Sequence, residues 1–98
     1  MSNFRNEEID HLFQAILSLK SVEECYLFFE DACTIKELNE IAQRFEVACL
    51  LDEKKNYQEV NKKTGASTAT ICRVNKCLNY GEGYRTVIDR LKEEGKLS

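Results

Sequence analysis

Glycine and proline, the residues that most often interrupt helices, are almost absent from this chain. Its 98 residues contain no proline, and its four glycines stand at positions 65, 81, 83 and 95, so the first 64 residues contain neither. Such long uninterrupted stretches, with apolar residues repeating at intervals of three and four, are typical of helices. The sequence therefore predicts an all-α fold of about six helices.

Polar residues that cap helices mark where five of these helices begin. They are Asn6, Ser21 with Glu24, Thr34 with Glu37, Asn56 with Glu59, and Ser67. We expect the third helix to span about residues 35–53 and to turn an apolar face inward. That face is formed by Ile35, Leu38, Ile41, Ala42, Phe45, Ala48 and Cys49. A last helix should cover about residues 84–95.

The helix that follows Ser21 is apolar on nearly all sides, from Val22 to Phe29. A helix of this kind must be buried all round, and a chain this short has only a limited core. We therefore expect a homodimer with the first two helices in its interface, and we assign dimerisation helices to about residues 6–53 and 84–95. The alternative is a central core helix of a monomer. In either case residues 1–98 should form a single domain.

Positive charge is concentrated in one quarter of the sequence. The chain carries a net charge of −3, but residues 54–79 hold six basic side chains and one acidic one, while residues 1–53 hold four basic and twelve acidic ones. A basic stretch in an acidic chain indicates contact with a polyanion, although a lysine-rich solvated surface gives the same count. The motif within the stretch decides between them.

The basic stretch contains the pattern of a helix-turn-helix. Asn56 with Glu59 begins a short helix that ends at Gly65, a residue type that adopts the left-handed conformation at little cost. Ser67 then caps a second helix that runs to about Asn79. Apolar residues stand where the two helices of such a motif pack together: Val60, Ala66, Ile71 and Val74. We predict DNA-reading helices over about residues 56–80.

The second of these helices begins with small and mostly polar side chains. They are Ser67, Thr68, Ala69 and Thr70. Small side chains let a helix start approach base edges in the major groove, and its free N–H groups and hydroxyls bind phosphate. Basic residues that flank this point would contact the DNA backbone: Lys62, Lys63, Arg73 and Lys76. Double-stranded DNA is therefore the predicted partner.

Several other classes of function lack their sequence signals. The five cysteines and the single histidine, His11, do not have the spacing of a metal site, so no metal is predicted. We expect the cysteines to be small buried apolar residues in a reducing compartment. The alternative is a redox-sensing thiol, for which Cys72 is the best candidate because Arg73 and a helix N-terminus are close in the sequence. Without a membrane span or signal peptide, the protein is expected to be cytoplasmic. Without a nucleophile–base pair, paired carboxylates or a phosphate loop, it is not expected to be an enzyme.

The run Gly65-Ala66-Ser67-Thr68-Ala69-Thr70-Ile71-Cys72-Arg73 closely resembles the recognition segment of the tryptophan repressor. Together with Tyr57-Gln58-Glu59 before the turn and Tyr80-Gly81-Glu82-Gly83-Tyr84 after it, the chain is similar to the YerC/YecD branch of that superfamily over roughly residues 6–92. The resemblance implies a six-helix protomer that intertwines with its twin, and a repressor that acts at an operator.

The resemblance also implies roles for individual residues. Base edges would face Thr68, Ala69 and Cys72, and bases or phosphates would lie near Gln58, Asn61, Ser67 and Thr70. A small-molecule corepressor would contact Arg44 and Arg73, with Thr34 in a similar setting. This chain has Cys77 where the family has a serine, and a thiol is a poorer hydrogen-bond partner than a hydroxyl. That difference argues against tryptophan as effector, and no resident cofactor is predicted.

Taken together, these features predict a sequence-specific DNA-binding transcriptional regulator, a repressor, that acts as a homodimer. The alternative is a helical protein–protein interaction module with incidental DNA affinity, which the acidic first half of the chain favours. The two interpretations differ in the expected salt dependence, because specific binding to DNA displaces phosphate counterions and weakens steeply as salt is added.

Overall fold

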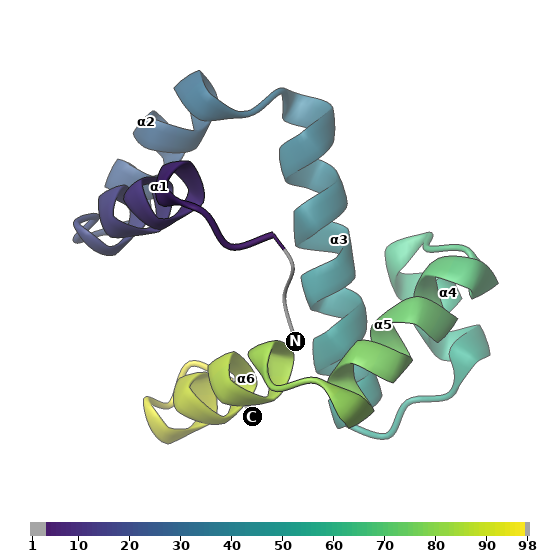
Figure 1. The fold of residues 1–98 in the computed structure, drawn as a ribbon. Helices are drawn as coiled ribbons and strands as arrows, with labels where there is room; N and C mark the ends of the chain where they lie inside the picture. Colours follow the sequence, from purple (N-terminus) through teal and green to yellow (C-terminus); the bar gives the residue numbers. More distant parts are fainter. Residues whose placement is uncertain (1–3, 98) are drawn as a thin grey trace. The chain divides into compact units, whose positions relative to one another are not determined.

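The computed structural model describes residues 4–97, and the part of the chain it describes contains six helices and no strand. The helices are α1 (Glu7–Leu17), α2 (Val22–Ala32), α3 (Ile35–Asp52), α4 (Tyr57–Thr64), α5 (Thr68–Tyr80) and α6 (Gly83–Glu93), as Figure 1 shows. The predicted all-α class is confirmed. No helix of the described residues has the length and apolar character needed to cross a membrane.

The predicted helix starts are confirmed, with one change in detail. Asn6 accepts a hydrogen bond from the Ile9 amide at 2.8 Å, and Thr34 and Glu37 form a complete capping box. At α2 the Ser21 hydroxyl accepts from the Glu24 amide as expected, but the Glu24 carboxylate accepts from the amide of Lys20. In the capping box of α2, the amide bound by Glu24 is therefore that of Lys20, one residue before the Ser21 amide that the spacing predicts.

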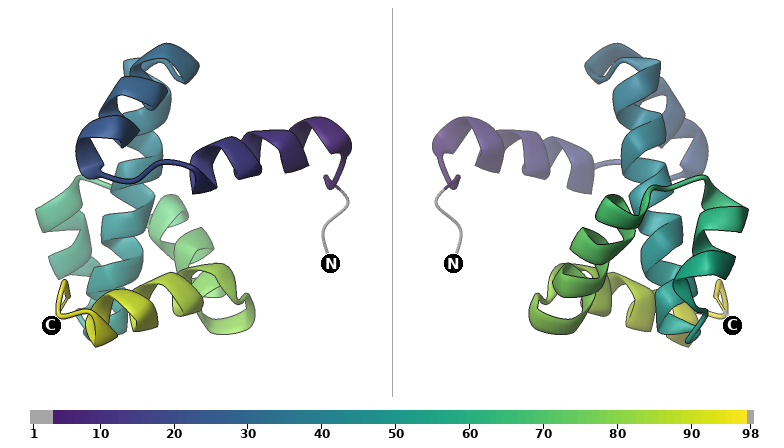
Figure 2. Two further views of the ribbon diagram at one scale, coloured as in Figure 1. Left: turned by 90° about the vertical axis from the view of Figure 1, so that its left-hand side faces the viewer. Right: turned by 90° about the vertical axis from the view of Figure 1, so that its right-hand side faces the viewer.

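Contacts divide the chain into two compact units, the first ending at Leu38 and the second beginning at Asn39. In the first unit, α1 and α2 contain no buried residue. Their apolar side chains are open to solvent, with Leu17 84% and Val22 73% exposed. Figure 2 shows α1 extending away from the loop that joins it to α2. Within the first unit, therefore, no other segment buries α2.

The second unit has a core of its own. Figure 2 shows α4, α5 and α6 gathered around the C-terminal half of α3. All four helices and the turn between α4 and α5 contribute buried side chains: Val47, Ala48, Cys49, Leu51, Val60, Ala66, Ile71, Val74, Leu78 and Ile88. Phe45 and Tyr84 pack against this core with their ring centroids 6.4 Å apart. This core positions the helix-turn-helix.

The buried face of α3 differs from the predicted one. Ala48 and Cys49 are buried as expected, but Ile35 is 81% exposed and Ile41 is 49% exposed. Val47 and Leu51, which lie outside the predicted stripe, are buried. The reason is that three helices surround the C-terminal half of α3, so more than one face of that half is covered.

A polar contact ties the end of α3 to α6. The Asp52 carboxylate accepts hydrogen bonds from Lys92 Nζ and, at 2.7 Å, from Arg85 Nη1. The hydrogen bond from Lys92, ahead of the one from Arg85, holds the pKa of Asp52 below its usual value. Asp52 closes a helix whose C-terminus repels negative charge, and the two cations offset that repulsion.

The cysteines do not share one environment. Cys49 is buried and Cys33 is half-buried, but Cys25, Cys72 and Cys77 are exposed. The prediction that all five are buried is wrong for these three, because α2 contains no buried residue and α5 buries Ile71, Val74 and Leu78 instead. Burial raises the pKa of the Cys49 thiol to about 11, and Glu46, Glu53 and Asp52 add to the effect. Cys49 therefore remains a protonated, apolar core residue at neutral pH.

Candidate nucleic-acid interface

The turn between α4 and α5 is held by hydrogen bonds from α4. Asn56 and Glu59 form the predicted capping box, and Gly65 ends α4 in the left-handed conformation at φ 76°. Asn61 Nδ2 donates to the carbonyl of Ala66 at 2.7 Å, and the Ala66 amide donates to Thr64 Oγ1 at 3.1 Å. The turn is thus fixed by side chains of α4, and one end of the Asn61 amide is occupied in holding it.

The predicted packing of the helix-turn-helix is confirmed. Val60 of α4, Ala66 of the turn, and Ile71 and Val74 of α5 are each buried. Ser67 caps α5 by accepting from the Thr70 amide at 3.2 Å, and its hydroxyl donates to Thr70 Oγ1. Because the inner face of α5 is fully used in the core, its outer face and its first turn are left for other contacts.

The residues predicted to contact DNA lie on α4, on the turn and on α5, although nothing in the fold tests their contact with DNA. Of the ten, only Thr70 is half-buried. The exposed ones are Gln58, Asn61, Lys62, Ser67, Thr68, Ala69, Cys72, Arg73 and Lys76. Their accessibility is the geometry that a reading surface requires.

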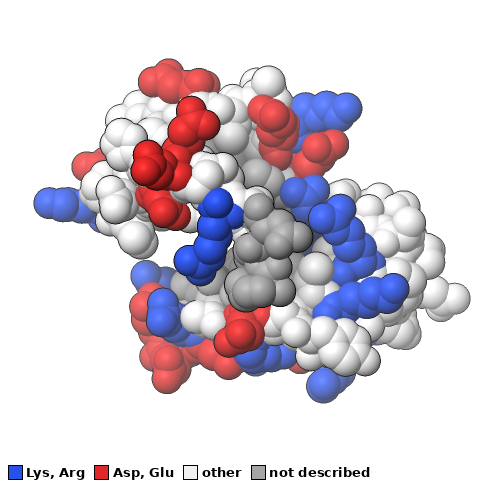
Figure 3. All heavy atoms as spheres, viewed as in Figure 1, with Lys and Arg blue, Asp and Glu red and all other residues white. Residues whose placement is uncertain are grey.

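Charge on this surface is positive and unpaired. Within residues 4–97, no ion pair involves any basic residue of the 54–79 stretch. The ion pairs of the second unit instead use Arg85, Lys92 and Lys96, which lie on or just after α6. Figure 3 shows Lys and Arg side chains over the region of α4 and α5, and acidic side chains over α1 and α2. The charge of the helix-turn-helix is therefore available to an anionic partner.

Sequence reasoning missed one residue of this region, Tyr57. It lines a cavity of about 280 Å³ together with Gln58, Asn61 and Thr68, where α4 meets the start of α5. Burial raises the pKa of the Tyr57 phenol, and the neighbouring Cys72 thiol adds to this. Tyr57 contributed to the family resemblance but was not assigned to the site, because its contact with α5 depends on how the two helices pack.

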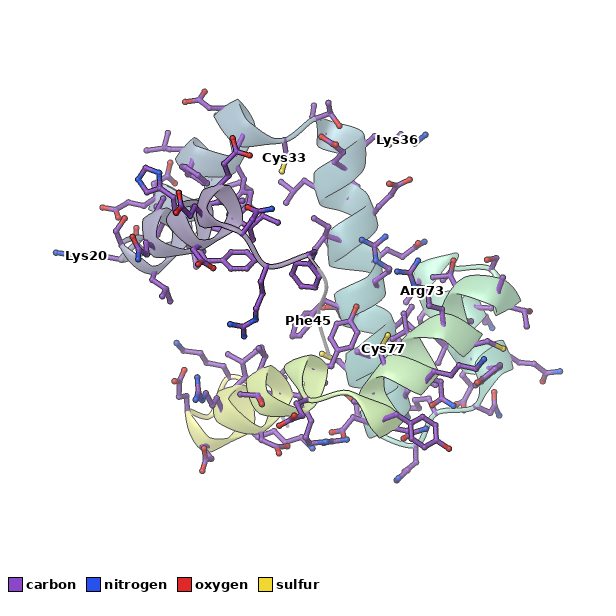
Figure 4. All side chains as sticks on the ribbon, in the orientation of Figure 1. Lys20, Cys33, Lys36, Phe45, Arg73 and Cys77 are labelled. Atoms are coloured by element: carbon purple, nitrogen blue, oxygen red, sulfur yellow. The ribbon has the colours of Figure 1, made fainter. Side chains whose placement is uncertain are left out.

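The residues predicted for an effector are not all brought together. Arg44 is half-buried on α3, and Figure 4 shows Arg73 and Cys77 on the side of α5 that faces α3. Thr34 belongs to the first unit, where its hydroxyl caps α3. The cavity of about 530 Å³ between α3 and α4 contains none of these four residues. It is lined by Asn39, Ala42, Gln43, Glu46, Leu50, Lys63 and Thr64.

The fold and this surface define an all-α helix-turn-helix protein. The chain matches the model of the Trp repressor protein family over residues 7–92, and it belongs to that family. It is 53% identical, over 94 residues, to the uncharacterised protein YerC of Bacillus subtilis strain 168, covering 95% of this chain and 90% of that protein. The predicted likeness to the YerC branch is thus confirmed.

Solved structures agree with this assignment. A TrpR-like protein from Eubacterium eligens ATCC 27750 superposes with a TM-score of 0.88 at 54% identity, covering 96% of this chain and 95% of the other. A protein from Staphylococcus aureus, provisionally described as a Trp repressor, gives 0.86 at 42% identity, with 90% and 89% covered. The same arrangement of helices therefore occurs in at least two related proteins.

Proposed function

We propose that the chain is a sequence-specific DNA-binding transcriptional regulator that acts as a repressor and as a homodimer. The first turn of α5 enters the major groove, while lysines and arginine of α4 and α5 contact the phosphate backbone. One observation supports this more than any other. The single basic stretch of the sequence coincides with an exposed, small-residue helix start, and its cations have no acidic partners within the described residues.

The size of the side chains at that helix start also favours DNA. Thr68 and Ala69 add little bulk beyond the backbone, so base edges can come close to the helix end. The free N–H groups of the same turn and the Ser67 hydroxyl are suited to phosphate oxygens. The family name points to repression, and the exposed apolar side chains of α1 and α2 support a second chain as their cover.

Thr68→Asp tests the proposal because it places a carboxylate at the reading surface. An acidic residue in the first turn of a helix stabilises that helix, so lost binding cannot be attributed to unfolding. Like charges brought together at an interface cost several kcal/mol, and we expect DNA affinity to fall by about 100-fold or more. Ala69→Asp should act in the same way.

The matched control is Thr86→Asp, which makes the same change on an exposed position of α6. Affinity would be measured by fluorescence anisotropy on fragments selected from a random DNA pool, across a salt series. Equal binding by Thr68→Asp and Thr86→Asp would remove the start of α5 from the reading surface. If the wild type shows no DNA binding at low salt, the proposed function fails.

A further inference from the structure

A second cavity lies at the corner between α3 and α4. Its volume is about 400 Å³, which falls in the range of roughly 300–1,000 Å³ that small-molecule sites occupy. Its walls come from the end of α3, the corner, the start of α4, the second half of α5 and α6. The lining residues are Leu51, Asp52, Lys54, Lys55, Asn56, Tyr57, Asn75, Leu78, Asn79 and Arg85.

The lining carries excess positive charge. Asp52 is its single carboxylate, and it is already satisfied by Arg85 and by Lys92, which is outside the lining. Lys54 and Lys55 have no ion pair within residues 4–97. Arg85 makes its ion pairs through Nη1, so the rest of its guanidinium makes no ion pair among these residues. Lys54 and Lys55 therefore bring to the cavity positive charge that no carboxylate of the described residues neutralises.

Neutral donors complete the lining. Asn56 uses its Oδ1 to cap α4, which leaves the N–H₂ group of its amide as a donor. Asn75 and Asn79 contribute two more amides, and Tyr57 contributes a hydroxyl. Cations together with amide and hydroxyl donors are the groups that hold a phosphate, whose oxygens only accept hydrogen bonds.

The backbone at the corner gives an independent reason to look for a role of Lys54. Lys54 has φ 68°, the one non-glycine residue with a left-handed backbone in residues 4–97. The Lys54 amide donates to the Leu51 carbonyl at 3.0 Å and the Lys55 amide to the Leu50 carbonyl at 3.1 Å, a C-terminal motif in which glycine is the usual residue. A lysine here retains charge at a conformation that glycine adopts with less strain.

We propose that the corner cavity, lined by Lys54, Lys55 and Arg85, is a phosphate-binding site. Two sources of phosphate suit this chemistry. Tyr57 lines both this cavity and the one at the start of α5, so the two cavities adjoin, and the backbone of DNA bound at α5 is one source. A free phosphorylated small molecule is the other source. The DNA arm rests on the proposed function, and the small-molecule arm does not.

Both arms use the full chain and the same set of variants. Lys54→Asn removes the charge and keeps a residue that tolerates the left-handed backbone, while Lys54→Arg keeps the charge. Lys20→Asn is the matched control, because Lys20 is exposed in the loop before α2 (Figure 4) and lies outside the cavity lining. Thermal unfolding would confirm that each variant is folded before binding is measured.

For the small-molecule arm, inorganic phosphate and then pyrophosphate are titrated at constant ionic strength. Amide signals of Tyr57 and the side-chain amides of Asn75 and Asn79 are followed by NMR. A saturable shift that Lys54→Asn weakens at least fivefold, and that Lys54→Arg and Lys20→Asn retain, assigns the site to a free phosphate. Linear shifts without saturation, equal in all variants, exclude this source.

For the DNA arm, affinity is measured against salt concentration. A phosphate contact by Lys54 predicts that Lys54→Asn lowers the slope of log affinity against log salt by about one, with Lys54→Arg and Lys20→Asn unchanged. An unchanged slope together with unsaturable phosphate shifts overturns the proposal. If the wild type does not bind DNA at all, the proposed function fails, and the phosphate titration still decides whether the cavity is a phosphate site.

Discussion

The helix-turn-helix and the first two helices differ in what they do with apolar side chains. In α4 and α5 the branched aliphatic side chains are buried within the chain, and the basic side chains remain outside. In α1 and α2 no residue is buried, and Leu17, Val22, Tyr26 and Leu27 are each more than half exposed. One region is completed by its own chain. The other leaves several large apolar side chains exposed, as a region that awaits a partner chain would.

Charge follows the same division. The acidic residues are concentrated in the first half of the chain, and the unpaired basic residues lie in 54–79. Two chains joined through their α1 and α2 regions would bury apolar surface and leave both basic surfaces free. The α1 and α2 region is therefore suited to a partner chain, and the helix-turn-helix is suited to a polyanion. Three measurements test this difference.

The largest effect is expected from Ile71→Ala in the core of the helix-turn-helix. Ile71 is fully buried, and truncating a buried isoleucine to alanine costs roughly 2–5 kcal/mol of unfolding free energy. Urea denaturation at several protein concentrations would measure the loss, with Thr86→Ala as a surface control. A loss below about 0.5 kcal/mol, the range of surface changes, would show that α5 does not depend on packing within its own chain.

The second expected effect is on association, through Leu27→Ala in α2. Leu27 is 57% exposed in the single chain, so the change should leave the stability of the dissociated chain nearly unaltered. Burying a leucine in an interface contributes roughly 1.5–3 kcal/mol, which corresponds to about a 10- to 100-fold rise in the dimer dissociation constant per chain. Sedimentation equilibrium would measure it. A wild type that stays monomeric at every concentration would show that α2 is covered by something else.

The smallest effect concerns the polar contact that ties α3 to α6. The pKa of Asp52 is lowered in the folded chain, chiefly by Lys92. A carboxyl with a depressed folded-state pKa stabilises the fold above its unfolded pKa, and this contribution is lost as pH falls through the folded value. We expect Asp52→Asn to lower the free energy of unfolding by about 1 kcal/mol at pH 7. The difference should vanish at a pH below the folded-state pKa of Asp52. The unfolding free energy of both proteins would be measured by urea denaturation across pH. If it changes with pH in the same way in the wild type and in Asp52→Asn, the loss of stability in acid is due to other carboxyls.

Local features of the fold were predictable because neighbouring residues encode them. Asn6, Thr34, Asn56 and Ser67 cap helices as their spacing indicates, and Gly65 ends α4 in the expected conformation. The candidate DNA-contact residues could also be named, since they follow from the position of the turn and from the family resemblance. The Glu24 carboxylate accepts from the Lys20 amide rather than from the Ser21 amide, because its flexible side chain reaches either of these two adjacent amides.

Sequence alone thus determined the helices, the turn and the basic stretch, each of which depends on residues within a few positions of one another. Tertiary structure decided which face of α3 is covered, burying Val47 and Leu51 and leaving Ile35 and Ile41 exposed. It also joined Asp52 to Arg85 and Lys92, far apart in the chain, and closed the cavity beside Lys54 and Tyr57. These features follow from the angles at which α4, α5 and α6 pack on α3, and periodicity along a single helix carries no information about those angles.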